Sequence, residues 1–383
     1  MDNTYKKFYS KIIKNMTSST ELIFPGGLPD SKAYKLEAEA LNKRIIGASC
    51  TPNDPAKKLY DEWQHIPSIH SNNFEDAFVK TILEHNVSQI YCPHLLLYKA
   101  IEKVILSNNL SVCFRNPPPG ELETTKINSL YKSATEFHEI ASNMATNHKD
   151  QLPNKEEIAG LLFYTRAIPG MTSEEKLAAF TSIFPQLPKG DIVEIGAFRG
   201  KSSYFLSWAA KRYNIGKVLV VDPWNSAIAQ QNDSPDQLKD PKQEMVKDVE
   251  SFWEAAYHGF LAVLSPFIGH INYLRKPSQD AAIIYLSNKE IQSSAFGTTE
   301  YCGKISLIHI DGNHDYDMVK KDCDSWLKFM KPGGWIIFDD YVWLHGDGPT
   351  RAGDEYLQDN QDNIELSFCF DKSLFIQLKS RKK

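Results

Sequence analysis

Four side chains that could bind a cation or move a proton fall in two short segments near the end of the chain. Asp311 and His314 lie in the heptapeptide IDGNHDY, and Asp339 and Asp340 lie in the tetrapeptide FDDY. Three carboxylates held together in a partly buried site repel one another strongly. A divalent cation relieves that repulsion, and oxygen ligands favour Mg²⁺ or a similar hard ion. The pattern therefore predicts a metal site with the ligands Asp311, Asp339 and Asp340.

A histidine beside such a site suggests proton transfer. A cation lowers the pKa of a bound hydroxyl, and a neighbouring imidazole can take the released proton. We therefore predict that His314 is a general base acting on a sugar or catechol-type hydroxyl. His309 lies inside the apolar run ISLIHID, and we expect it to be a core histidine rather than a ligand.

A second segment, GDIVEIGAFRGKSS, reads as a strand, a glycine-bearing turn and the start of a helix. The strand leads into Gly196, the turn reaches Gly200, the helix starts near Ser202, and the next strand ends at Asp222. In parallel α/β sheets, ligands bind beyond the carboxyl ends of the strands. The pattern differs from the glycine-rich turn that binds a pyrophosphate. Glu194 before the turn instead suits a ligand with an ammonium group and no phosphate.

Alternating strands and helices position these residues. ISLIHID is apolar throughout, as expected of a buried parallel strand, and WIIFDD (335–340) is the next predicted strand. The runs ELSFCF and SLFIQLK near the end are separated by two residues, the spacing of a β-hairpin. Thr172 and Glu175 match a capping box, which predicts a helix start at Thr172.

These motifs resemble two related families. The EIGAFRG turn followed by Asp222 is similar to the cofactor loop of class I S-adenosylmethionine-dependent methyltransferases. The pair IDGNHDY and KPGGWIIFDDY resembles the metal-dependent, macrocin-type sugar O-methyltransferases of antibiotic biosynthesis. The resemblance, over roughly residues 160–380, implies an α/β fold with a seven-stranded Rossmann-like methyltransferase sheet that ends in an antiparallel hairpin. It also implies S-adenosylmethionine and Mg²⁺ as cofactors, and methyl transfer to a hydroxyl of a small molecule, a sugar or glycosylated metabolite.

Carried over residue by residue, the resemblance implies a base at His314 and metal ligands at Asp311, Asp339 and Asp340. Within the turn and the following strand, the expected cofactor-binding residues are Glu194, Gly196, Gly200, Ser202 and Asp222. We also expect Trp224 to stack on adenine or to close a lid formed by residues 223–270, and Asp280 to reach the adenine amino group.

The first part of the chain forms a second α/β pattern. ELIF, RIIGAS, SQIYCPH and LSVCF are strand-length runs separated by helical stretches, which predicts a small parallel sheet. The strand ending IFPGG and the segment FEDAFVKTILEHNVSQIYCPH resemble the pre-ATP-grasp domain of ATP-grasp ligases. No ATP-grasp module is recognisable downstream, so this part could bind a ligand or a protein, or be purely structural. The predicted division is an N-terminal domain (1–120), a helical linker (121–155) and a methyltransferase domain (156–383).

Composition narrows the functional classes. The formal net charge of −5 argues against a general nucleic-acid or anionic-membrane partner. Six cysteines lack C-x-x-C spacing, which indicates free thiols in a reducing compartment. No apolar segment typical of a secretory signal is seen at the N-terminus. We therefore expect a cytoplasmic protein with a small-molecule substrate, and a homo-oligomer is compatible with the sequence.

Two alternatives remain open. One is a non-catalytic binding protein that uses the methyltransferase fold as a scaffold. The other is an enzyme similar to the proteins named cephalosporin hydroxylases, which have similar sheets with a D-H-D-Y turn.

Overall fold

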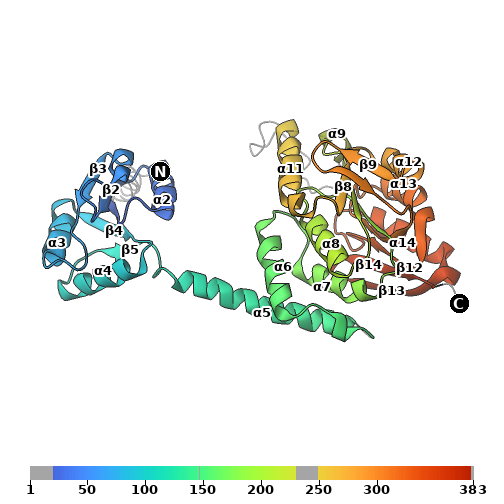
Figure 1. Cartoon of the computed structure of the whole chain (residues 1–383), viewed down its shortest axis with the longest axis horizontal. Helices are drawn as coiled ribbons and strands as arrows, with labels where there is room; N and C mark the ends of the chain where they lie inside the picture. The colour runs from blue at the N-terminus through green and yellow to red at the C-terminus, as the bar shows by residue number, and fades with distance from the viewer. Residues whose placement is uncertain (1–19, 146, 230–248, 381–383) are drawn as a thin grey trace, which may run out of the picture. The chain divides into compact units, whose positions relative to one another are not determined.

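Two compact units make up the chain, Met1–Ser129 and Leu130–Lys383. The structure, a computed structural model, describes residues 20–145, 147–229 and 249–380. Figure 1 shows the first unit in blue to cyan and the second in green to red. Each unit has hydrophobic core clusters of its own.

The N-terminal unit contains a sheet of five parallel strands in the order β3-β2-β1-β4-β5. This confirms the predicted small parallel sheet. Its main elements are β1 (Thr20–Ile23), α2 (Pro29–Ala40), β2 (Arg44–Ser49), β3 (Glu62–His65), α3 (Phe74–Glu84), β4 (Val87–Tyr91), α4 (Leu95–Ser107) and β5 (Cys113–Phe114).

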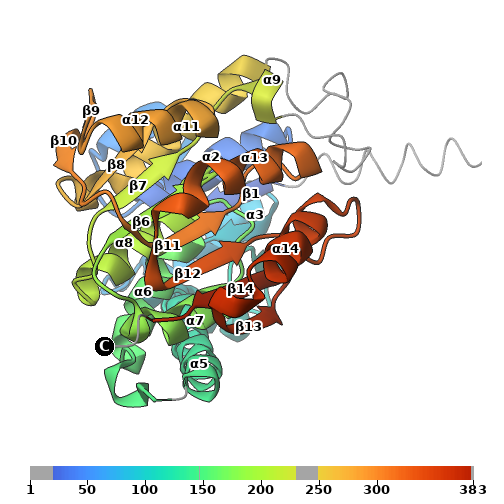
Figure 2. The same cartoon turned by 90° about the vertical axis from the view of Figure 1, so that its right-hand side faces the viewer.

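The C-terminal unit contains a seven-stranded sheet in the order β13-β14-β12-β11-β6-β7-β8, which can be followed from strand to strand in Figure 2. The strands from β12 to β8 in that order are parallel, whereas β14 and β13 are antiparallel to their neighbours. This confirms the predicted Rossmann-like sheet with an antiparallel last hairpin. The strands are β6 (Asp191–Ile195), β7 (Val218–Val221), β8 (Ile271–Leu274), β11 (Ile305–Ile310), β12 (Met330–Phe338), β13 (Ile364–Phe370) and β14 (Ser373–Leu378).

Helices cover both faces of this sheet, and its central strands are buried on both sides. Every residue of β6 and β11 is buried, as expected of parallel strands between two helical layers. Neighbouring residues of β11 alternate between two core clusters: Leu307 packs into one and Ile308 into the other. The helices are α5 (Glu121–Met144), α6 (Lys155–Ala167), α7 (Glu174–Ile183), α8 (Lys201–Arg212), α9 (Ser226–Ala229), α11 (Val249–Leu264), α12 (Ser278–Ser287), α13 (Tyr316–Trp326) and α14 (Gly348–Asp359).

Three local features differ from, or add to, the sequence predictions. Strand β12 begins at Met330, earlier than predicted, because Met330 already pairs with Ile305 of β11. The predicted insert after α12 forms a separate hairpin of β9 (Glu290–Ser293) and β10 (Gly297–Glu300). Residues 230–248 of the predicted lid lie outside the described residues.

The last hairpin turns at Asp371 and Lys372, both of which have positive φ. Positive φ at both central residues is what a two-residue type I′ turn requires, so the predicted hairpin spacing is explained by the turn itself. Within the described part of the chain, no helix combines the length and the apolar character that crossing a bilayer requires.

Candidate active site

The predicted metal and base residues gather at the carboxyl ends of two neighbouring strands, β11 and β12, with β6 on the other side of β11. The backbone N–H of Asp311 donates to Ile195 O at 2.8 Å, and that of Asp339 donates to Ile310 O at 2.9 Å. These bonds continue the strand pairing by one residue, so the side chains after β11 and β12 emerge at the same edge. The topology therefore explains why two segments almost thirty positions apart meet.

Two overlapping groups at this edge have the geometry of metal-ligating clusters. One is His309, Asp311 and Asp339; the other is Asp311, His314 and Asp340, and the ligand atoms in each lie within 4.8 Å of one another. His314 Nε2 lies 3.3 Å from Asp340 Oδ2. The structure thus brings together all four residues that the sequence predicted for the metal and base roles. We call these residues, Asp311, His314, Asp339 and Asp340, the acidic edge.

Burial and mutual repulsion make two of these carboxyl groups hard to ionise. Burial, and then the charge of Asp339, raise the pKa of Asp311 well above its usual range. The same two causes raise the pKa of Asp340, whose backbone has a positive φ of 45°. A positive charge beside Asp311 and Asp340 would relieve this repulsion, so the donor set fits a hard divalent cation.

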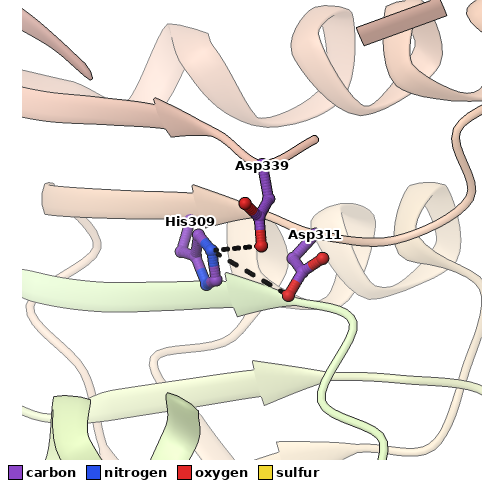
Figure 3. A group of neighbouring side chains, drawn as sticks. All are labelled: His309, Asp311 and Asp339. Carbon is purple, nitrogen blue, oxygen red and sulfur yellow. Dashed lines mark ion pairs between the residues drawn. The ribbon is translucent and has the colours of Figure 1, made fainter. Parts of the chain in front are cut away.

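His309 is fully buried, and Figure 3 shows its ring beside the carboxylates of Asp311 and Asp339. Its Nδ1 lies 3.1 Å from Glu194 Oε1, and its Nε2 lies 3.7 Å from Asp339 Oδ2 and 4.0 Å from Asp311 Oδ2. Burial lowers the pKa of His309, but the contacts with Asp339 and Glu194 outweigh it and raise the pKa to about 10. The expected core histidine is therefore buried and also forms part of the charged site.

Lys176 is the site residue that the sequence analysis missed. It lies in α7 with only 6% of its surface exposed, and its Nζ is 2.5 Å from Asp339 Oδ1 and 2.7 Å from Asp339 Oδ2. Burial lowers the pKa of Lys176, but Asp339 and then Asp311 raise it by more. Burial raises the pKa of Asp339, yet His309 and Lys176 together hold it well below its usual range.

The start of α7 explains why Lys176 points into the site. Ser173, rather than the predicted Thr172, is the N-cap: its Oγ accepts a hydrogen bond from the backbone N–H of Lys176 at 2.9 Å. All residues from Lys176 to Ile183 are buried. A lysine in the first turn of a helix that continues into the apolar run Leu177–Phe180 is the signal that could have revealed it, because a buried ammonium needs a carboxylate partner.

The predicted cofactor turn lies directly beside this edge. Gly196 has a φ of 86°, and a Cβ there would fall 1.9 Å from the backbone oxygen of Asp311. Gly200, with a φ of 85°, precedes α8, and a Cβ there would meet Leu264 Cδ2 at 2.5 Å. Both glycines are therefore required by conformation and by close packing. Ser202 is buried in the first turn of α8.

The two acids of the turn make contacts within the protein. Asp222, at the end of β7, accepts hydrogen bonds from the backbone N–H groups of Ala197 at 2.8 Å, Phe198 at 3.0 Å and Trp224 at 2.7 Å. Burial raises the pKa of Asp222, against the effect of these three donors. Glu194 is fully buried, accepts a hydrogen bond from Ser203 Oγ and pairs with His309. Asp222 thus shapes the turn, and Glu194 anchors it to β11.

Trp224 and Asp280 are the remaining residues expected to contact the cofactor. Trp224 was expected to stack on adenine or close a lid, but only 1% of it is exposed, and its ring packs against Tyr257 and Phe260. Trp224 Nε1 donates a hydrogen bond to Phe198 O at 2.7 Å, so Trp224 packs against the glycine turn between β6 and α8. Asp280 is exposed in the first turn of α12, and its expected contact with the adenine amino group stays a prediction.

Comparison with known proteins identifies the region that holds these residues. Residues 193–341 match a family described as a methyltransferase domain. That range includes the glycine turn, Asp222 and all four residues of the acidic edge. This similarity agrees with the methyltransferase domain that the sequence predicted. A search of curated proteins found no match.

Several solved structures resemble the chain. The O-methyltransferase NovP is 15% identical, with 65% of this chain and 100% of NovP covered and a TM-score of 0.38. The calicheamicin methyltransferase CalS11 is 15% identical, with 63% and 91% covered and a TM-score of 0.38. An O-methyltransferase from Bacillus cereus in complex with SAH is 14% identical, with 59% and 92% covered and a TM-score of 0.35.

Proposed function

We propose that this protein is an S-adenosylmethionine-dependent O-methyltransferase that acts, with the help of Mg²⁺ or a similar cation, on a hydroxyl of a small molecule such as a sugar or glycosylated metabolite. One observation carries the proposal. The glycine turn and the acidic edge of a methyltransferase domain are in direct contact, since only the lack of a Cβ at Gly196 allows the Asp311 backbone to approach it. A methyl donor bound at the turn would therefore lie next to a cation bound at the edge.

The residues present fit both groups. The turn at Gly196 and the acid at the end of β7 have the arrangement that the sequence predicted for the cofactor, whereas Glu194 faces the protein interior. The carboxylates of the acidic edge offer the hard oxygen ligands that Mg²⁺ prefers. When bound, S-adenosylmethionine would supply the methyl group and the cation would lower the pKa of the acceptor hydroxyl.

In this proposal, His314 takes the proton from that hydroxyl. Its Nε2 lies 3.3 Å from Asp340 Oδ2, so a proton received by the imidazole would be stabilised by the adjacent carboxylate. Asp340 would thereby orient the base as well as favour a bound cation. Trp343 lies against His314 with ring centroids 5.4 Å apart, which limits the space beside the imidazole.

Isothermal titration calorimetry with S-adenosylmethionine, with and without Mg²⁺, tests the proposal. We expect binding of the cofactor, and transfer of a labelled methyl group to a small molecule in a cell extract. Absence of binding under both conditions would contradict the proposal. Binding without any transfer would favour the non-catalytic scaffold, and turnover that needs oxygen and a 2-oxoacid would favour the hydroxylase-like alternative.

The remaining sequence predictions extend this proposal. We infer that the N-terminal unit is a pre-ATP-grasp-like domain, with either a binding or a structural role, and that the protein works in the cytoplasm without a nucleic-acid partner. The five-stranded parallel sheet supports the first inference, and the net charge of −5 supports the second.

A further inference from the structure

A buried ammonium group lies among the carboxylates of the acidic edge. Lys176 Nζ contacts both oxygens of Asp339, at 2.5 and 2.7 Å. The side chains of Lys176 and Asp339 are 7% and 4% exposed, so water screens this pair very little. It is therefore a tight ion pair in the place where the sequence analysis expected a metal ligand.

Asp339 has little capacity left for a cation. Its Oδ1 accepts hydrogen bonds from Lys176, from Ser373 Oγ at 2.6 Å and from the backbone N–H of Asp340 at 3.0 Å. A carboxylate oxygen has about two lone-pair sites, so Oδ1 is saturated. Its Oδ2 faces Lys176 and His309, at 2.7 and 3.7 Å. A cation at Asp339 would have to displace a buried ammonium group.

Asp311 and Asp340 are in a different situation. Both are partly exposed, at 26% and 21% of their side chains, and both lie with His314 in one ligand-sized group. Lys176 balances the charge of Asp339, and Glu194 forms a second buried pair with His309. Two carboxylates remain at the accessible side of the edge, and two negative charges match one divalent cation.

A second observation points to a bound group here. His309 is fully buried, and its Nε2 has no hydrogen-bond partner among the residues that the structure describes. That atom is directed at the carboxylates of Asp311 and Asp339, as Figure 3 shows. A buried N–H without a partner is costly, and the lone pair of a bound water oxygen beside these carboxylates would satisfy it.

We propose that Lys176 is a built-in counter-ion that withdraws Asp339 from the cation's ligands, so that a divalent cation is held by Asp311 and Asp340 alone, with water and the acceptor hydroxyl. Magnesium sites in enzymes commonly use one or two carboxylates and keep several waters. This ligand set leaves His314 to act as the base. The inference rests on the proposed function only in assuming a cation at this edge.

Binding of Mn²⁺, followed by electron paramagnetic resonance, tests the proposal without any need for activity. In Lys176→Met, the released Asp339 becomes a third ligand, so Mn²⁺ should bind about tenfold more tightly. In the charge-neutral double variant Lys176→Met/Asp339→Asn, the affinity should return to within about threefold of the wild type. Asp340→Asn should weaken binding by about tenfold or more. Lys211→Met, which removes an exposed lysine, is the control for net charge.

The results that would overturn the proposal are distinct. If Asp339 is a ligand in the wild-type protein, the double variant will lose Mn²⁺ as severely as Asp340→Asn does. Failure of the wild-type protein to bind Mn²⁺ would overturn it as well. Calorimetry with S-adenosylmethionine distinguishes the two failures. A protein that binds S-adenosylmethionine but not Mn²⁺ contradicts the cation site and leaves cofactor binding intact. If Lys176→Met does not fold, the double variant, which has no uncompensated buried charge, still decides between the outcomes.

Discussion

At the residue scale, pairs of opposite charge hold the acidic edge together. Asp339 pairs with Lys176, and Glu194 pairs with His309, and all four side chains are buried. Each pair joins elements that are far apart in the chain, since α7 meets β12 in the first and β6 meets β11 in the second. These contacts position the carboxylates more directly than the hydrophobic core does.

Loss of the Lys176 ammonium should therefore destabilise the protein strongly. Removing one partner of a buried ion pair leaves an uncompensated charge and costs about 3–5 kcal/mol, so Lys176→Met should lower the free energy of unfolding by roughly that amount. Lys176→Met/Asp339→Asn should recover most of the loss, because no charge remains unpaired. Urea unfolding measures both. Equal stability of the single and double variants would contradict the buried pair.

The raised pKa of His309 predicts a loss of stability at alkaline pH. Its pKa rises from 6.5 to about 10 in the folded protein, so the folded state binds the proton more tightly than the unfolded state. The stabilising effect is fully present below pH 6.5 and is lost as the pH rises towards 10. Urea unfolding at a series of pH values in this range should show that the free energy of unfolding falls more steeply with pH in the wild type than in His309→Gln. If the free energy of unfolding depends on pH in the same way in both proteins, the ion pair between His309 and Glu194 is refuted.

Sequence patterns identified the acidic edge because its residues follow apolar strands directly. They did not identify Lys176 as a partner of Asp339, since 163 positions separate the two in the chain. Trp224 was misjudged for a similar reason: the aromatic side chains that bury it come from α11 and β8. Residues that act through long-range contacts leave little local signal.

At the scale of elements, the glycine turn between β6 and α8 is the feature most sensitive to substitution. A Cβ at Gly196 would fall 1.9 Å from the backbone oxygen of Asp311, and the φ of 86° is strained for any other residue. Gly196→Ala should therefore destabilise the protein or abolish cofactor binding, measured by thermal unfolding and calorimetry. Wild-type behaviour of this variant would show that the turn is not constrained as described.

Gly160→Ala is a matched control. Gly160 lies inside α6, and a Cβ added there would have no neighbouring atom within 4 Å, so it would meet open space. Alanine favours helix over glycine by about 1 kcal/mol, and this variant should be slightly more stable than the wild type. The contrast separates the effect of the turn from that of substituting any glycine.

The succession of the C-terminal strands along the chain followed from sequence because the runs are apolar, and the resemblance to methyltransferases implied the antiparallel last hairpin. The start of β12 did not follow from the sequence, since Lys331-Pro332-Gly333-Gly334 is typical of a turn. Met330 nevertheless pairs with Ile305, and the strand runs through these residues. Pairing resumes at Trp335, opposite Leu307, so residues 331–334 form an irregularity within β12 and keep part of their turn character.

At the scale of the whole molecule, the two units have separate cores and the methyltransferase features lie entirely in the second. A fragment of residues 121–383, which keeps α5 whole, should fold and bind S-adenosylmethionine as tightly as the full chain. Circular dichroism and calorimetry would check this. Loss of binding in a folded fragment would show that the N-terminal unit contributes to the cofactor site.

The central claim is that a methyl donor and a hard cation bind side by side at one edge of the C-terminal sheet. Relaxation of the S-methyl protons of bound S-adenosylmethionine in the presence of Mn²⁺, measured by nuclear magnetic resonance, tests it most directly. We expect strong paramagnetic enhancement in the wild type and its loss in Asp340→Asn. Binding of both groups without any enhancement would contradict the claim.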